Sequence, residues 1–362
     1  MQEQYDKKLD ALLEHCTPVN GQDIFVASQI VPVCEVKNGE KVLKRLAINY
    51  KSTITDHLED IPQVPTVCND EIDKLKGQYR SVIDMTGAFQ QIPLAPGLSR
   101  DICAIVTPRG YYIPNDMQFG IKVAPAIWNT NMRQLLHSYN GRGPIKAACV
   151  VDDVCVTGDS PQEHFENFHE LIYRLYVAGL KANVTKCKFY QDEVKFLGKI
   201  VDHEGVKLDT KTTEPIVKMQ EPCDKAGLRS FLGHMSYIGR HCPDIRSARS
   251  PLDELLKPEV KWHWEQKHQE AFDRCRKLAG NSAKLVHYDP NKPLVLTTDA
   301  SPFGVGACLS HKVVDAKGRT RLQPIAYASA SLKSSEKAYA QIDREGLAVY
   351  WAINHFRQYL WG

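Results

Sequence analysis

Hydrophobic positions along the first two hundred residues follow two spacings, one typical of strands and one typical of helices. Residues 24–36 are rich in β-branched side chains, and Asn38-Gly39 follows them as a strong turn signal. Residues 44–50 provide a return strand, so 24–50 is predicted to be a β-hairpin. By the same criteria, helices are predicted at 5–15, 124–139 and 161–178, and strands at 78–84, 102–106, 110–113 and 195–201.

The pattern changes near residue 206. Residues 210–280 favour helices, with breaks marked by Pro222, Pro243 and Pro258. Strands follow, one of them over 293–299, and then a single helix is predicted over 336–360. Its expected apolar face consists of Tyr339, Ile342, Gly346, Val349, Ile353 and Phe356. The predicted domains are 1–206, 207–284 and 285–362.

Composition limits the classes of protein that the chain can belong to. The hydrophobic fraction is 43% and the net charge +3, without a run of Lys or Arg, so any nucleic-acid binding must come from local grooves. The 11 cysteines are scattered and form no Cys-x-x-Cys, which favours reduced thiols in a cytoplasmic or nuclear compartment. We expect no secretory signal and no membrane partner, because the N-terminus is charged and no apolar run approaches ~18 residues.

The paired aspartates Asp152-Asp153 interrupt an apolar run over 147–156. β-branched residues on both sides predict two short strands, with the aspartates where the chain turns. Two carboxylates on a tight turn repel each other unless a cation lies between them, and oxygen ligands favour Mg²⁺ or Mn²⁺. An isolated Asp-Asp is more often a solvated turn, because Asp is a common turn former.

A third carboxylate, Asp84, ends the predicted strand 78–84. Strands that carry Asp84 and Asp152 can lie side by side in one sheet, and their acids then converge at one edge. Three carboxylates around two cations ~4 Å apart is the arrangement used for two-metal nucleotidyl transfer. In that reaction one cation activates a primer 3′-hydroxyl and the other holds the departing pyrophosphate.

Ordered sequence blocks accompany these acids. They lie at 45–51, 81–94, 117–126, 179–189, 195–198, 228–233, 262–264, 298–307 and 324–329. Together they resemble the polymerase region of gypsy-class long-terminal-repeat retrotransposons, a reverse transcriptase followed by ribonuclease H. The resemblance implies an α+β right-hand polymerase, whose fingers and palm have an antiparallel palm sheet. A helical thumb and connection and a partial ribonuclease H-like α/β domain would follow.

The resemblance also implies roles for individual residues. Asp84 and Asp152 would bind two Mg²⁺ or Mn²⁺ ions, with Asp153 as the supporting carboxylate, and Lys186 would protonate the departing pyrophosphate. Around the nucleotide, Phe89 would exclude a ribose 2′-hydroxyl, Lys37 and Arg45 would hold the triphosphate, and Phe119 and Gly120 would flank the nucleotide and template. The primer end would be positioned by Phe196, Leu197 and Gly198. Each has a structural alternative: core packing for Phe89, solvated charges for Lys37 and Arg45, and ordinary turns for Gly120 and 196–198. Lys181 and Lys188 compete with Lys186.

Asp299 and Glu345 correspond to the first two acids of the family's ribonuclease H site. In this family the third acid lies on the strand after the helix that carries the glutamate, and residues 1–362 end before that strand. We therefore expect this chain alone not to cleave RNA in hybrids.

The expected partners are a primed RNA or DNA template, deoxynucleotides and other Pol polyprotein segments. Template–primer binding should rest on phosphate contacts and weaken steeply with salt. Some positions differ from the family pattern: Val150 replaces a usual Tyr, Asn49 an Asp and Gln118 a Pro. A second hypothesis is therefore a decayed or domesticated fragment that only binds nucleic acid. A phospho-acceptor receiver domain is disfavoured, because Asp84 precedes the acid pair.

Overall fold

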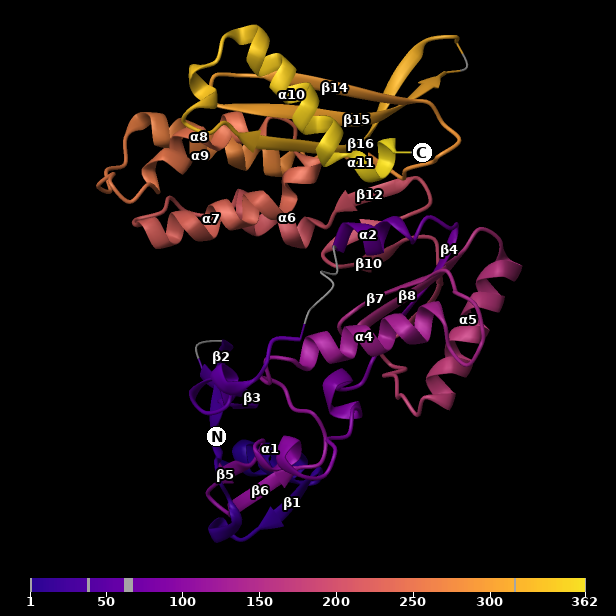
Figure 1. Ribbon diagram of the computed structural model, residues 1–362, viewed down its shortest axis with the longest axis vertical. Helices are drawn as coiled ribbons and strands as arrows, with labels where there is room; N and C mark the ends of the chain where they lie inside the picture. Colours follow the sequence, from indigo (N-terminus) through magenta and orange to yellow (C-terminus); the bar gives the residue numbers. More distant parts are fainter. Residues whose placement is uncertain (1, 38–39, 62–67, 316, 362) are drawn as a thin grey trace. The chain divides into compact units, whose positions relative to one another are not determined.

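The computed structural model describes residues 2–37, 40–61, 68–315 and 317–361, which form two compact units (Figure 1). The first unit comprises residues 1–75 and 80–191, and the second comprises 76–79 and 192–362. None of the helices in these described ranges is both long and apolar enough to cross a bilayer. Every cysteine whose side chain is described is a free thiol.

The first sheet of the first unit has five strands in the order β1-β6-β5-β2-β3. They are β1 Cys16–Val19, β2 Ser28–Lys37, β3 Glu40–Ile48, β5 Ile105–Thr107 and β6 Gly110–Pro114, with α1 (Gln2–Leu13) preceding them. β2 pairs with β3 in antiparallel register, which confirms the hairpin predicted over 24–50. The predicted turn at Asn38-Gly39 lies outside the described residues.

The second sheet of the first unit carries the acids, and its strand order is β7-β8-β4-β9. It contains β4 Tyr79–Asp84, β7 Ala147–Val150, β8 Asp153–Gly158 and β9 Lys188–Gln191; the helices in this part of the chain are α2 Cys68–Asp73, α3 Leu98–Asp101, α4 Ala124–His137 and α5 Pro161–Val177. β7 pairs antiparallel with β8, and β4 with β9. These pairings confirm the predicted antiparallel palm sheet. α4 packs on β7 and α5 on β8 (Figure 1).

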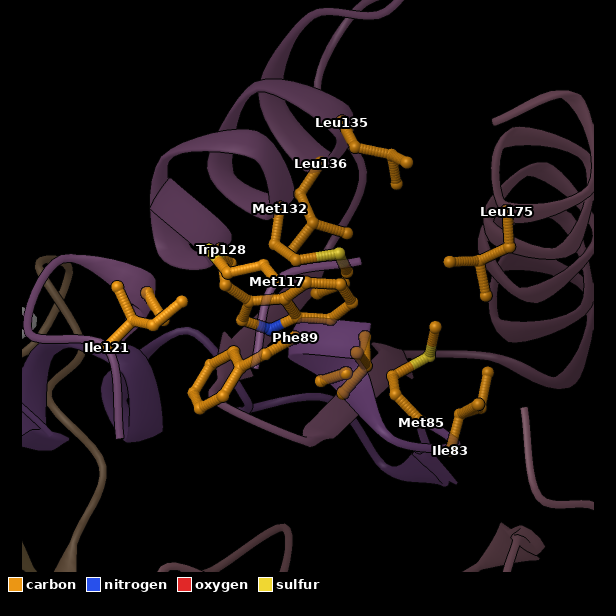
Figure 2. Packing of buried hydrophobic residues seen from close by; sticks show 14 of the residues in the cluster. Ile83, Met85, Phe89, Met117, Ile121, Trp128, Met132, Leu135, Leu136 and Leu175 are labelled. Atoms are coloured by element: carbon orange, nitrogen blue, oxygen red, sulfur yellow. The ribbon is translucent and has the colours of Figure 1, made fainter. Parts of the chain in front are cut away.

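Helix α4 contributes the apolar side chains at the centre of this unit. Trp128, Met132 and Leu135 recur at helical spacing and are almost fully buried. Figure 2 shows the Trp128 ring among Met117, Met132 and Phe89. Leu175 of α5 belongs to the same cluster, so both helices anchor the acid-bearing sheet through one core.

The second unit begins with a small sheet, in the order β10-β11-β12-β13, and a group of helices. Its elements are β10 Val194–Phe196, β11 Lys199–Val201, β12 Gly205–Leu208, α6 Thr210–Val217, α7 Lys225–Ile238, α8 Ile245–Leu255, α9 Gln266–Gly280 and β13 Leu285–Val286. Pro222, Pro243 and Pro258 lie between helices, as predicted. Phe231 and Phe272 join α7 to α9, with ring centroids 4.5 Å apart.

The rest of the second unit is a three-stranded antiparallel sheet followed by helices. Its strands are β14 Leu294–Ala300, β15 Gly304–Val314 and β16 Thr320–Ser331, and its helices are α10 Gln341–His355 and α11 Arg357–Leu360. β14 confirms the strand predicted over 293–299. Ala352 and Phe356 pack against Leu309 and Ile325 of the sheet.

The predicted continuous strand over 195–201 is wrong, because the chain reverses within it. Val194 pairs with Val201 across a two-residue turn, in which Leu197 (φ 51°) and Gly198 (φ 67°) adopt left-handed backbone. The apolar run favoured a strand, since leucine seldom adopts positive φ. The turn at 196–198, which both the primer-positioning prediction and its alternative require, is present.

The predicted single helix over 336–360 is also wrong. Ala340 is extended before α10, and the helix is interrupted at Phe356 before α11. The predicted apolar face is mostly exposed, including Ile342 (77%), whereas the small side chains of Ala348 and Ala352 are fully buried. Small residues let a helix approach a sheet closely, so size rather than hydrophobicity determined which face is buried.

Candidate active site

The three predicted acids lie at the same end of one sheet. β4 ends at Asp84, its neighbour β8 begins at Asp153, and Asp152 occupies the two-residue turn that joins β7 to β8. The amide of Met85 donates a hydrogen bond to the Asp152 carbonyl, at 2.8 Å. The residue that follows Asp84 is therefore tied directly to the turn. The structure brings together the acids that the sequence motifs single out.

Burial and mutual repulsion disfavour the charged forms of two of these acids. Burial raises the pKa of Asp152, and the nearby Asp84 raises it further. The pKa of Asp153 is likewise raised by burial, by Asp84 and by Asp152. Lys186 opposes these effects, and its ammonium lies 3.5 Å from Asp84 Oδ1. The acids thus form a cluster of negative charge, with the Lys186 ammonium beside it.

These carboxylates fit a divalent cation. Asp152 Oδ1 is buried and has no hydrogen-bond partner, which leaves a ligand atom available. Among the described residues, no three His, Cys, Asp or Glu side chains form a group that could hold a metal ion by itself. Mg²⁺ is usually held by one or two carboxylates together with water and substrate phosphates, so an incomplete protein cage is appropriate for it.

Among the three candidate lysines, Lys186 is the one for which the described residues show an ion pair with an acid of the site. The Asn183 amide donates to the Asp84 carbonyl at 2.7 Å, and the Lys186 amide donates to the Asn183 carbonyl. This short segment directs the Lys186 ammonium to the acids. Lys188 instead pairs with Val82 as part of β9.

The residues predicted to contact the nucleotide are Phe89, Phe119 and Gly120. The rings of Phe89 and Phe119 are 5.1 Å apart; Phe89 is buried and Phe119 is 39% exposed. Gly120 has φ 98°, and a Cβ there would lie 3.0 Å from the Ile48 carbonyl oxygen. This position therefore requires glycine. Gln118 is buried and donates to the Asp116 carbonyl.

The predicted triphosphate ligands lie on the β2–β3 hairpin. Arg45 is an exposed residue of β3, opposite Val33 of β2. The Lys37 backbone ends β2, while its side chain lies outside the described residues. Lys44 pairs with Glu35 at 3.5 Å, so the neighbouring cation of the hairpin is engaged locally.

The predicted primer-positioning residues lie in the second unit, on the β10–β11 turn. Phe196 is buried, while Leu197 and Gly198 form the turn itself. The Tyr237 hydroxyl donates to the Leu197 carbonyl at 2.5 Å, and the Thr212 hydroxyl donates to the Gly198 carbonyl at 2.9 Å. Helices α6 and α7 thereby fix the turn conformation.

The predicted ribonuclease H acids lie on two elements of the second unit. Asp299 is on β14, opposite Gly306, and lines a cavity of about 400 Å³ together with Arg246 and Arg274. Glu345 is exposed on α10 and accepts a hydrogen bond from Gln341 at 3.1 Å.

Trp128 is a site residue that the sequence motifs do not indicate. Its indole N–H donates to the carbonyl of Val151, at 2.5 Å, in the turn that carries Asp152. The only sequence signal is its place in an apolar helix stripe, which equally describes an ordinary core residue.

Two protein-family models match separate segments of the chain. Residues 29–201, the segment that contains all three clustered acids, match the family described as "Reverse transcriptase (RNA-dependent DNA polymerase)". This part of the chain is therefore similar to reverse transcriptase domains. Residues 264–362 match "RNase H-like domain found in reverse transcriptase", which contains Asp299 and Glu345. A match to reverse transcriptases is thus followed along the chain by a match to ribonuclease H-like domains.

Curated relatives are polyproteins of transposons. The "Retrovirus-related Pol polyprotein from transposon 412" of Drosophila melanogaster is 30% identical over 92% of this chain and 26% of its own length. The "Transposon Tf2-7 polyprotein" of Schizosaccharomyces pombe is 28% identical over 91% of this chain and 24% of its own length. The chain therefore spans about a quarter of the length of these relatives.

Solved structures with the same fold include a foamy viral protease-reverse transcriptase in complex with dsDNA. It is 20% identical and has a TM-score of 0.81, covering 99% of this chain and 72% of that one. The same viral protein in complex with an RNA/DNA hybrid has a TM-score of 0.75. This likeness confirms the predicted fold class, a reverse transcriptase fold with antiparallel sheets and a ribonuclease H-like domain.

Proposed function

We propose that this chain is an RNA-directed DNA polymerase, from a retrotransposon of the gypsy class, that adds deoxynucleotides to a primer 3′-hydroxyl. The observation that carries the proposal is the convergence of Asp84, Asp152 and Asp153 at one end of a sheet, with a buried and unpartnered oxygen on Asp152. The match of residues 29–201 to reverse transcriptases supports the reaction class.

Asp84 and Asp152 would hold two Mg²⁺ or Mn²⁺ ions, with Asp153 as the supporting carboxylate. When bound, such ions lower the pKa of the attacking hydroxyl and stabilise the departing pyrophosphate. The protein contributes the orientation of these carboxylates, and their mutual repulsion in a partly buried site favours cation binding. A deoxynucleotide triphosphate would complete the ligand set with its phosphate oxygens.

Other residues would bind and orient the nucleotide. Phe89 and Phe119 form an apolar contact that would lie under the sugar, and a ring there leaves no room for a ribose 2′-hydroxyl. Gly120 permits close approach of the backbone. Arg45 and Lys37 would offset the charge of the triphosphate from the β2–β3 hairpin.

Lys186 would donate a proton to the departing pyrophosphate. Its ammonium lies beside Asp84, and its side chain is 65% exposed, so it can reach a phosphate oxygen. General acid catalysis requires a proton donor within hydrogen-bond reach of the leaving group, and Lys186 is the lysine that the backbone directs to the acids.

The template–primer would be bound mainly through phosphate contacts, with the Phe196–Gly198 turn positioning the primer end. The complexes of the foamy viral protein with dsDNA and with an RNA/DNA hybrid are consistent with such a ligand. We propose that Asp299 and Glu345, two of the three acids of a ribonuclease H site, do not by themselves cleave RNA in hybrids.

Primer extension on poly(rA)/oligo(dT) tests the proposal. The wild-type chain should extend the primer with dTTP and Mg²⁺ or Mn²⁺. Asp152→Asn keeps the side-chain shape and removes the charge, so extension should fall at least about a hundredfold. Binding of the template–primer without extension, under both metals, would instead support the binding-only fragment.

A further inference from the structure

The turn that carries Asp152 contains an unfavourable backbone conformation. Val151, the first of its two central residues, has φ 52°. A β-branched residue rarely adopts positive φ, because its side chain then crowds the backbone. Such a conformation persists only where surrounding contacts hold it, and the direction of the Asp152 carboxylate depends on it.

Three hydrogen bonds hold this turn from different elements. The Trp128 indole of α4 donates to the Val151 carbonyl at 2.5 Å, and the Cys149 thiol donates weakly to the same oxygen at 3.6 Å. The Met85 amide donates to the carbonyl of Asp152 at 2.8 Å. The Trp128 bond is the strong side-chain contact to the strained residue.

Trp128 cannot move freely. Its side chain is 1% exposed and packs in the central cluster with Met132 and Phe89 (Figure 2). A hydrogen bond from a rigid, buried donor fixes the position of its acceptor closely. A phenylalanine would fill most of the same space, so apolar packing alone does not require the indole N–H.

We propose that Trp128 is a positioning residue of the polymerase centre, whose indole N–H holds the Val151 carbonyl and thereby fixes the Asp152 carboxylate for cation binding. This inference rests on the proposed function. Helix α4, which is not one of the acid-bearing strands, would then contribute a residue to the site. The contact would also explain how Val151 keeps a left-handed backbone conformation next to the proposed metal ligand Asp152.

The test compares Trp128→Phe with the wild type in two assays. Partners that orient metal ligands typically contribute 10–100-fold to metal affinity or activity. We therefore expect Trp128→Phe to lower kcat for dTTP addition about tenfold or more, with little change in the KM for template–primer. Mn²⁺ binding to the substrate-free protein, measured by calorimetry, should weaken by a similar factor.

Trp264→Phe is the matched control. The Trp264 indole N–H also donates a hydrogen bond, to Gln269 at 3.0 Å in the second unit. The same chemical change there should leave the Mn²⁺ affinity unaltered. A fall of equal size in both variants would overturn the proposal.

A second variant separates positioning from core packing. Glycine adopts positive φ without steric cost, so Val151→Gly should reduce the need for the Trp128 contact. Adding Trp128→Phe to Val151→Gly should lower Mn²⁺ affinity less than it does in the wild type. Equal losses in both backgrounds would assign Trp128 to packing and overturn the inference. Absence of extension by the wild type would contradict the proposed function, while the Mn²⁺ comparison still decides the role of Trp128.

Discussion

Asp152 and Asp153 lie in surroundings that oppose their own charge, because burial and neighbouring carboxylates raise the pKa of both. The sequence indicated these acids and Asp84, since adjacent aspartates between β-branched runs are a local pattern. It did not indicate Trp128, because a buried helix tryptophan looks the same in sequence whether or not its N–H reaches a catalytic turn. Nor did it indicate the positive φ of Val151, which only the surrounding contacts impose.

The raised pKa values predict a dependence of stability on pH in the metal-free protein. A carboxyl whose pKa is higher in the folded state retains its proton more strongly there, so the unfolded state binds fewer protons and stability falls as pH rises. The loss of folding stability begins as the pH rises through 3.8, the ordinary pKa of an aspartate, and it is complete once the pH exceeds the raised pKa of the folded state. Asp153→Asn should therefore raise the urea midpoint at pH 7 in EDTA, with little gain at pH 3.5.

Urea titrations of both proteins at several pH values measure this effect. Mg²⁺ at pH 7 should reduce the advantage of Asp153→Asn, because bound cations offset the repulsion in the wild type. A gain of equal size at pH 3.5 and pH 7 would show that charge is not its cause.

Among the helices and strands, those with strong local signals were predicted correctly. The 24–50 hairpin and the proline-marked helix boundaries are confirmed because turn residues and hydrophobic periodicity both specify them. The errors at 195–201 and 336–360 arise from tertiary contacts. Tyr237 and Thr212 stabilise a turn that leucine disfavours, and close packing selects the alanine face of α10.

The β10–β11 turn provides a test of this interpretation. Gly198 has φ 67°, and a Cβ there would lie 3.0 Å from the Tyr237 hydroxyl. Gly198→Ala should destabilise the protein by about 1–2 kcal/mol, because left-handed backbone is costly for an L-residue. Chemical denaturation measures the difference.

Gly233 serves as the control, since it lies within α7 and a Cβ there meets nothing within 4 Å. Gly233→Ala should stabilise the helix by up to about 1 kcal/mol. If both substitutions shift the free energy of unfolding in the same direction, the left-handed backbone of Gly198 is not the reason that the turn requires glycine.

At the scale of the whole molecule, the two units differ in the acids that they supply. The first unit gathers Asp84, Asp152 and Asp153, whereas the ribonuclease H-like domain supplies Asp299 and Glu345 within residues 1–362. The fold class was predictable because ordered blocks extend over almost the entire chain. The contacts that set the geometry of each site could not be predicted in this way, because they join segments that lie far apart in the sequence.

The difference between the units predicts separate activities in solution. We propose that the purified chain extends primers yet leaves the RNA of a labelled RNA/DNA hybrid intact, since Asp299 and Glu345 supply one carboxylate fewer than the three acids of the first unit, and the affinity for divalent ions depends on ligand charge. Gel electrophoresis of the hybrid measures cleavage. Hybrid cleavage that disappears in Asp299→Asn would refute this prediction.

Extension of an oligo(dT) primer on poly(rA) with dTTP is the decisive experiment for the polymerase centre. It compares the wild type with Asp152→Asn, in Mg²⁺ and separately in Mn²⁺. The polymerase assignment predicts that the wild type extends the primer and that Asp152→Asn extends it at least about a hundredfold more slowly in both metals. No addition by the wild type with either metal, or equal addition by the two proteins, would contradict it.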